Sequence, residues 1–149
     1  MQGIFEQDVK TQIQSRIDNL KPTAQRLWGK MDVSQMLAHC SAALEVAVGD
    51  KKPPRIFIGR ILGPFIKPVF LNEKPLKRNT PTDKSFVMTG QKDYEKEKRR
   101  LKQLINRFAD EGAANCTTHP HSFFGKLTAE EWSIGTFKHL DHHLRQFGA

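Results

Sequence analysis

Apolar residues recur at helical intervals along this 149-residue chain, and this periodicity is the feature that most restricts its fold. Near the N-terminus, five apolar residues follow one another at spacings of four, four, four and three, which places them on one face of an α-helix. No segment shows the convincing alternation of apolar and polar residues that a half-buried strand requires. The sequence therefore predicts an all-α protein whose first helix spans Ile4 to Leu20. The five residues are Phe5, Val9, Ile13, Ile17 and Leu20.

Two capping boxes mark the starts of two further helices. Asp32, with Gln35 three residues later, can satisfy the free backbone N–H groups at the start of a second helix. That helix is expected to end at Gly49. Thr128 and Glu131 form the same pattern before the final helix. Both boundaries are local signals, so they are predicted from a few neighbouring residues.

A third long helix is predicted from Lys92 to Glu111, because its apolar residues fall on one face and its charged residues largely on the other. Gly112 is placed to end it. The basic run in this helix is interpreted as a solvated face. Four long helices predict a four-helix bundle, formed by a single domain that spans residues 1–149.

A long, irregular crossover is predicted between the second and third long helices. Its first part, Arg55 to Phe70, is apolar but interrupted at Gly63-Pro64, so we expect one or two helical turns there. Its second part, Leu71 to Thr89, has little periodicity and is interpreted as a solvated linker. The apolar run contains charges and prolines and is too short for a membrane span of about 20 residues. We therefore expect no membrane partner.

Charge and cysteine content restrict the functional class. The formal charge of +8 invites a nucleic-acid partner, but the basic residues are spread along the chain without interleaved aromatic side chains. The two cysteines, Cys40 and Cys116, form no disulfide framework, and the N-terminus does not resemble a signal peptide. The sequence favours a cytoplasmic protein that does not bind nucleic acid.

Three histidines give the strongest indication of a functional site. His139 and His143 lie four residues apart, so on the final helix both imidazoles can point at one position. His39 shares the apolar face of the second helix and can meet them inside a bundle. Three histidine ligands leave one coordination position open, which is typical of a catalytic metal. The alternatives are a solvated terminal helix, whose histidines favour the negative end of the helix dipole, and a core histidine at position 39.

The chain resembles the DinB-like superfamily over nearly its whole length. The resemblance implies a four-helix bundle that holds a divalent metal through one histidine of the second helix and an HxxxH pair of the last helix. The matching residues are His39, His139 and His143. Characterised members include transferases and isomerases that use low-molecular-weight thiols. The segments that carry the resemblance are Leu27–Met31, Gln35–Cys40, His119–Pro120, Phe124–Thr128, Glu131–Trp132 and His139–Gln146.

The remaining histidines are not assigned to the metal. His142 lies at a different angle on the final helix, and it is expected beside the site or partly exposed. His119 and His121 are two residues apart, would point in opposite directions in an extended loop, and are not expected to chelate. Cys40 is interpreted as a small buried hydrophobe. The residues that could orient ligands or anchor a substrate are Asp141, Arg145 and Gln146.

The sequence therefore predicts a metal-dependent enzyme whose open metal position accepts a thiolate or a water. The expected metal is zinc or nickel, with iron as an alternative, because histidine ligands suit all three. The expected substrate is a small molecule, and a low-molecular-weight thiol is a candidate. The alternatives are a non-catalytic metal-binding module and a basic protein that docks on nucleic acid through Lys98-Arg99-Arg100 and residues 74–84. The apolar segment from Ile56 to Phe70 also predicts a homodimer.

Overall fold

The computed structural model describes residues 1–149 and contains five α-helices and no β-strand, which confirms the predicted all-α class. Two short 3₁₀ helices, η1 and η2, lie on either side of the fourth α-helix. None of the five α-helices is both long enough and apolar enough to cross a membrane. The helix bounds are α1 Gln7–Asn19, α2 Val33–Ala47, α3 Phe57–Phe70, η1 Lys84–Phe86, α4 Tyr94–Glu111, η2 Ala113–Asn115 and α5 Ala129–Gln146.

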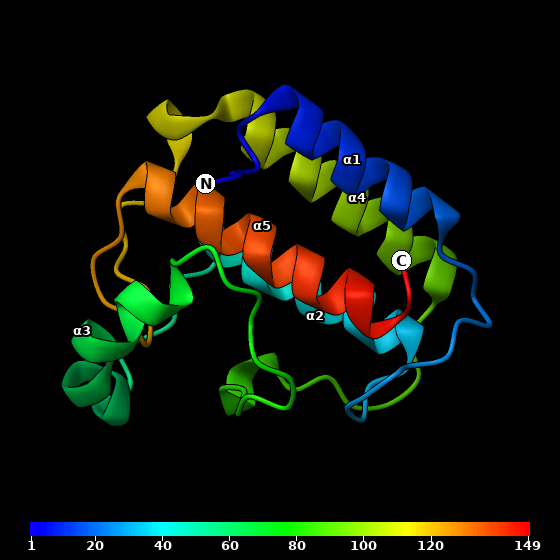
Figure 1. Ribbon diagram of the computed structural model, residues 1–149, viewed down its shortest axis with the longest axis horizontal. Helices are drawn as coiled ribbons and strands as arrows, with labels where there is room; N and C mark the ends of the chain where they lie inside the picture. The colour runs from blue at the N-terminus through cyan, green and yellow to red at the C-terminus, as the bar shows by residue number, and fades with distance from the viewer.

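Four of the helices surround the hydrophobic core, and α3 lies outside them. In Figure 1, α1 lies along α4 and α5 lies along α2, while α3 lies apart at the lower left. Helix α1 also contacts α5, and α2 also contacts α4, so each of these four helices has two neighbours. Their apolar faces meet in one buried cluster. Its largest fully buried members include Ile13, Ile17, Met36, Leu37, Leu101, Ile105, Phe108, Leu140 and Leu144.

The predicted helix boundaries are confirmed where a capping box specifies them. The Asp32 carboxylate accepts from the Gln35 backbone N–H, and the Gln35 side chain accepts from the Asp32 backbone N–H. Thr128 and Glu131 form the same reciprocal pair before α5. Losing such a cap costs about 1 kcal/mol. These caps therefore position the starts of the two helices that carry the histidines.

Helix α1 begins three residues later than predicted. Ile4 is fully buried, and its backbone N–H donates to the carbonyl of Ser133 in α5. The next backbone N–H, of Phe5, donates to the Ser133 hydroxyl at 3.0 Å. Phe5 has the same spacing as the apolar residues of α1. It lies, however, in a segment that is hydrogen-bonded to α5 and precedes Gln7, the first residue of α1.

The basic run of α4 is largely used inside the molecule. Lys98 donates to the Asp18 carbonyl at 3.0 Å, and Arg100 pairs with Glu45 and Glu97. Arg99 is exposed. Two of the three consecutive basic residues proposed for nucleic-acid docking are thus engaged by neighbouring helices.

The crossover differs from the prediction because residues 57–70 form one continuous helix. The prediction of one or two turns interrupted at Gly63-Pro64 is wrong: α3 continues through both Pro64 and Pro68. Proline in a helix interior removes a backbone hydrogen bond and usually costs about 3 kcal/mol. Helix α3 forms despite these two prolines, and it contacts a distant part of the chain. These contacts lie on one narrow face of α3.

That face contains two glycines that contact the loop before α5. Gly59 and Gly63 lie one helical turn apart and are the two buried residues of α3. A Cβ atom at Gly59 would lie 2.6 Å from Phe123 Cα and 2.7 Å from the Phe123 carbonyl oxygen. Arg55 donates to the carbonyl of Ser122 at 3.2 Å beside this contact. Glycine is therefore required here for the close approach of two backbones.

We predict that Gly59→Ala loosens α3 without unfolding the other helices. Alanine would improve helix propensity by about 1 kcal/mol, but its Cβ would overlap the Phe123 backbone. Hydrogen exchange should show faster exchange of the α3 amides and unchanged protection of α2 and α5. The matched control is Arg60→Ala, an exposed neighbour on the same helix. Slower exchange in α3 of the Gly59 variant would contradict the prediction.

Candidate metal centre

Helices α2 and α5 bring His39, His139 and His143 together, as the sequence predicted. The candidate ligand atoms of the three imidazoles all lie within 4.8 Å of one another. The Nε2 atoms of His39 and His139 are 2.9 Å apart, and the ring centroids of His139 and His143 are 4.7 Å apart. His39 and His143 are buried, and His139 is partly exposed. The group could hold a metal ion.

A backbone carbonyl orients His39. The Nδ1 atom of His39 lies 2.8 Å from the carbonyl oxygen of Phe86 in η1. A carbonyl oxygen only accepts, so the neutral ring must carry its proton on Nδ1. The lone pair of Nε2 then points toward His139. This is the usual arrangement of a metal-binding histidine, in which the second nitrogen is held by a backbone or side-chain acceptor.

A side-chain amide orients His143 in the same way. The Nδ1 atom of His143 lies 2.8 Å from Gln146 Oε1, and Gln146 Nε2 donates to the carbonyl of Trp28 at 2.8 Å. The second bond fixes the orientation of the amide, so Oε1 accepts from His143 Nδ1–H and leaves Nε2 of that ring free. Gly29, which has a positive φ of 80°, lets the segment between α1 and α2 approach Gln146 this closely. A Cβ at this position would overlap the Gln146 amide.

Burial keeps the three histidines neutral. It lowers the pKa of His143 to about 3, with a further lowering by nearby His39 and an opposing contribution from the Gln146 hydrogen bond. Burial also lowers the pKa of His39, against the effect of its bond to Phe86. The pKa of His139 falls well below its ordinary value, first through burial and then through the neighbouring histidines. Neutral imidazole is the form that binds metals.

The other histidines lie outside this group. His142 is partly exposed and packs edge-on against the Trp28 ring, with centroids 5.5 Å apart. The His119 Nε2 atom bonds to the Pro53 carbonyl at 2.9 Å. His121 Nδ1 accepts from two backbone N–H groups of its own loop, at 3.1 and 3.2 Å. Burial, assisted by Arg55, lowers the pKa of His121 to about 4. His119 Nε2 and His121 Nδ1 are thus both engaged in hydrogen bonds to the backbone.

The structure separates the three residues considered as orienting groups. Gln146 holds His143, whereas Asp141 pairs with Arg16 at 2.8 Å and with Arg145 at 3.8 Å. Arg145 is exposed. Phe86 could not be predicted as a partner of His39, because a backbone carbonyl has no sequence signature. The segment containing η1 is predicted as a solvated linker, but η1 lies against His39.

Neither cysteine is suited to bind the metal as a thiolate. Cys40 is buried, its Sγ atom lies 3.8 Å from Met36 Sδ, and burial raises the pKa of its thiol strongly. Burial also raises the pKa of Cys116, to about 11, with an opposing contribution from Thr117. Both thiols therefore stay protonated at neutral pH. This agrees with the interpretation of Cys40 as a small hydrophobe.

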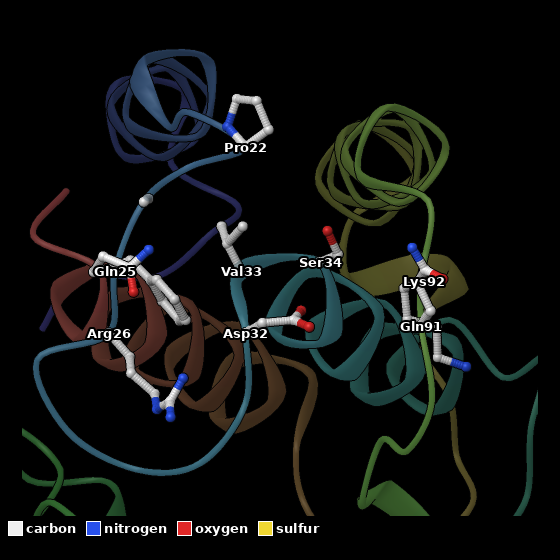
Figure 2. Close-up of a pocket in the computed structure, with 10 residues that line it drawn as sticks. Pro22, Gln25, Arg26, Asp32, Val33, Ser34, Gln91 and Lys92 are labelled. Atoms are coloured by element: carbon white, nitrogen blue, oxygen red, sulfur yellow. The ribbon is translucent and has the colours of Figure 1, made fainter.

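A surface cavity with a volume of about 240 Å³ lies elsewhere. It lies beside the start of α2, where Figure 2 shows Arg26, Asp32 and Lys92 around it. The Asp32 carboxylate is already used to cap α2. None of the three clustered histidines lines this cavity. The lining residues are Pro22, Ala24, Gln25, Arg26, Asp32, Val33, Ser34, Gln91, Lys92 and Phe147.

Comparison with known proteins gives one family match. The model of the family described as "Protein of unknown function (DUF1569)" matches residues 7–149, which include all three clustered histidines. No curated protein and no solved structure matches the chain. The chemistry of the centre must therefore be inferred from its own geometry.

We predict that the hydrogen bonds of the centre determine which nitrogen of each imidazole carries the proton. At about pH 8, where imidazoles are ordinarily neutral, His39 and His143 should be Nδ1–H tautomers. His119 and His121 serve as internal controls and should be Nε2–H tautomers, because His119 donates through Nε2 and His121 accepts through Nδ1. Long-range ¹H–¹⁵N correlation spectra distinguish the two forms. An Nε2–H tautomer at His143 would contradict the assigned role of Gln146.

Proposed function

This chain belongs to the DUF1569 family, and we propose that it is a metal-dependent enzyme whose ion is bound by His39, His139 and His143. One observation carries the proposal: three imidazoles with lowered pKa values lie with their ligand atoms within 4.8 Å of one another. The donor set fits a divalent transition metal, because all three donors are uncharged nitrogens. We propose zinc or nickel, with iron as an alternative.

The hydrogen bonds around the centre support a preformed site. Two of the three rings are held in the tautomer that leaves Nε2 free, one by the Phe86 carbonyl and one by Gln146. Losing such outer contacts typically weakens metal binding about 10- to 100-fold. Both rings therefore keep an Nε2 lone pair that a metal ion could use.

The position of the histidines also supports a relationship to the DinB-like superfamily. One histidine on α2 and two on α5, four residues apart, is the ligand pattern that the sequence resemblance implies. The four contacting helices α1, α2, α4 and α5 fit the bundle expected for that superfamily. We therefore propose a DinB-like four-helix bundle in which α3 is an addition to the crossover.

We propose thiol-dependent transfer or hydrolysis as the reaction class, with a small molecule as substrate. A divalent ion bound by three histidines would supply an open Lewis-acid position that accepts a thiolate or lowers the pKa of water to about 7. His39, His139 and His143 would orient this position, and the partly exposed side at His139 would admit the substrate. The chain would contribute proximity and orientation rather than a covalent nucleophile, because both of its thiols stay protonated.

We predict that the double variant His39→Ala/His143→Ala remains folded but no longer retains a divalent metal. The apolar cluster supplies the fold, and the histidines supply the ligands. Elemental analysis should detect one equivalent of metal in the parent protein and none in the variant, with unchanged helical circular dichroism. His119→Ala is the matched control and should retain the metal. Stoichiometric metal in the double variant would place the ion at another site, and loss of helicity would make the metal structural.

A second prediction tests the reaction class with cobalt in the centre. Titration with glutathione, bacillithiol or mycothiol should produce a thiolate-to-cobalt charge-transfer band, because a soft sulfur ligand competes well with water on such ions. The band should be absent in His139→Ala and present in His119→Ala. If no thiol produces it in the parent protein, the transferase proposal fails, and water activation or plain metal binding remains.

A further inference from the structure

The outward face of α3 is an apolar surface that no other part of the chain covers. Seven of the ten exposed large hydrophobic side chains of the protein belong to this one helix. Phe57 and Phe65 are each 77% exposed, far more than a side chain packed into a core. Contiguous apolar surface of this kind usually marks an interaction site. The other five residues are Ile58, Ile61, Leu62, Ile66 and Val69.

The opposite face of α3 packs against the rest of the protein, so the apolar face points outward. Gly59 and Gly63 pack on the Phe123 backbone, and Phe70 stacks on Phe124 with ring centroids 4.5 Å apart. Lys67 pairs with Glu131 at 2.8 Å. Rotating α3 to bury its phenylalanines would break all of these contacts. The fold therefore holds the apolar residues in solvent.

The sequence around α3 is strongly basic, although Lys51 and Lys67 pair with Glu45 and Glu131 outside it. Residues 51–78 contain eight Lys and Arg residues and a single acidic residue, Glu73, which gives a net charge of +7 out of the total of +8. The rest of the chain carries sixteen basic and fifteen acidic side chains, so it is close to neutral. The basic residues of the segment are Lys51, Lys52, Arg55, Arg60, Lys67, Lys74, Lys77 and Arg78.

We propose that α3 and its flanking basic residues bind the surface of an anionic phospholipid bilayer. Bulky apolar side chains on a short helix, next to Lys and Arg, are typical of helices that lie in the plane of a membrane. The apolar face would enter the boundary between headgroups and acyl chains, and the basic residues would meet the lipid phosphates. Helix α3 has 14 residues and is about 21 Å long, shorter than the ~30 Å hydrocarbon core, so it lies on the bilayer and does not cross it.

The positive charge around α3 favours an anionic bilayer over a second copy of the chain as its partner. A symmetric dimer through α3 would bring two basic segments together, each with a net charge of +7, or +5 once the Lys51–Glu45 and Lys67–Glu131 pairs are counted (7 − 2 = 5). Lys67 already pairs with Glu131 of its own chain. A nucleic acid would suit the charge, but its phosphates would meet a face whose most exposed groups are hydrocarbon. An anionic bilayer matches the charge and the apolar surface together. This inference is independent of the metal site.

The test is flotation of the full chain with lipid vesicles at about 0.1 M salt, where exposed charges still act over ~10 Å. The protein should bind vesicles of equal parts phosphatidylcholine and phosphatidylglycerol, and it should not bind vesicles of phosphatidylcholine alone. Phe57→Ser/Phe65→Ser should weaken binding at least tenfold, and so should Lys52→Gln/Arg60→Gln/Lys74→Gln. Leu27→Ser, at an apolar site outside α3 that is 66% exposed, is the control and should bind like the parent.

Circular dichroism establishes that each variant is folded before its binding is compared. Equal binding to both kinds of vesicle, or full binding by the Phe57/Phe65 variant, would overturn the proposal. A dimer by light scattering that the same variant dissociates, without vesicle binding, would assign the surface to a second copy. Salt-dependent binding to duplex DNA without vesicle binding would assign it to nucleic acid.

Discussion

The burial of α2 on nearly all sides is the constraint on which the arrangement of the three histidines depends. Eleven of its fifteen residues are buried, and it contacts α4, α5 and η1. Small residues such as Ala38 and Ala42 let neighbouring elements approach closely. An imidazole on such a helix cannot rely on water for its hydrogen bonds and must find partners inside the protein. His39 finds the Phe86 carbonyl on one side and His139 on the other.

Much of the helical framework could be predicted because its signals are local. The capping boxes at Asp32 and Thr128 involve residues three positions apart, and both form as expected. Helix α3 could not be predicted in the same way. Pro64 and Pro68 argue against a continuous helix, and the contact that accompanies it joins Gly59 and Gly63 to Phe123, about 60 residues further along the chain. Two glycines one turn apart are too common to reveal such a contact.

The three histidines were predictable for a different reason. His139 and His143 need only helical geometry to share a face, and His39 needs only two neighbouring helices to join them. The groups that orient them were harder to find. Gln146 was one of three candidates at the end of the final helix, and nothing in the sequence separates it from Asp141 or Arg145. Only the approach of Trp28 to the last turn of α5 distinguishes Gln146.

The bond between Gln146 and Trp28 also has a thermodynamic consequence for the molecule as a whole. It joins residues 118 positions apart, and the backbone N–H of Leu27 donates to the Gln146 carbonyl at 2.7 Å beside it. The contact that closes the linker between α1 and α2 onto α5 is thus the contact that orients His143. A molecule that binds the oriented His143 imidazole more tightly than the unoriented one must, by reciprocity, favour the linker contact with α5 by the same factor. Ligand binding at His143 and closure of the linker are therefore thermodynamically linked through Gln146, although the linker itself supplies no ligand.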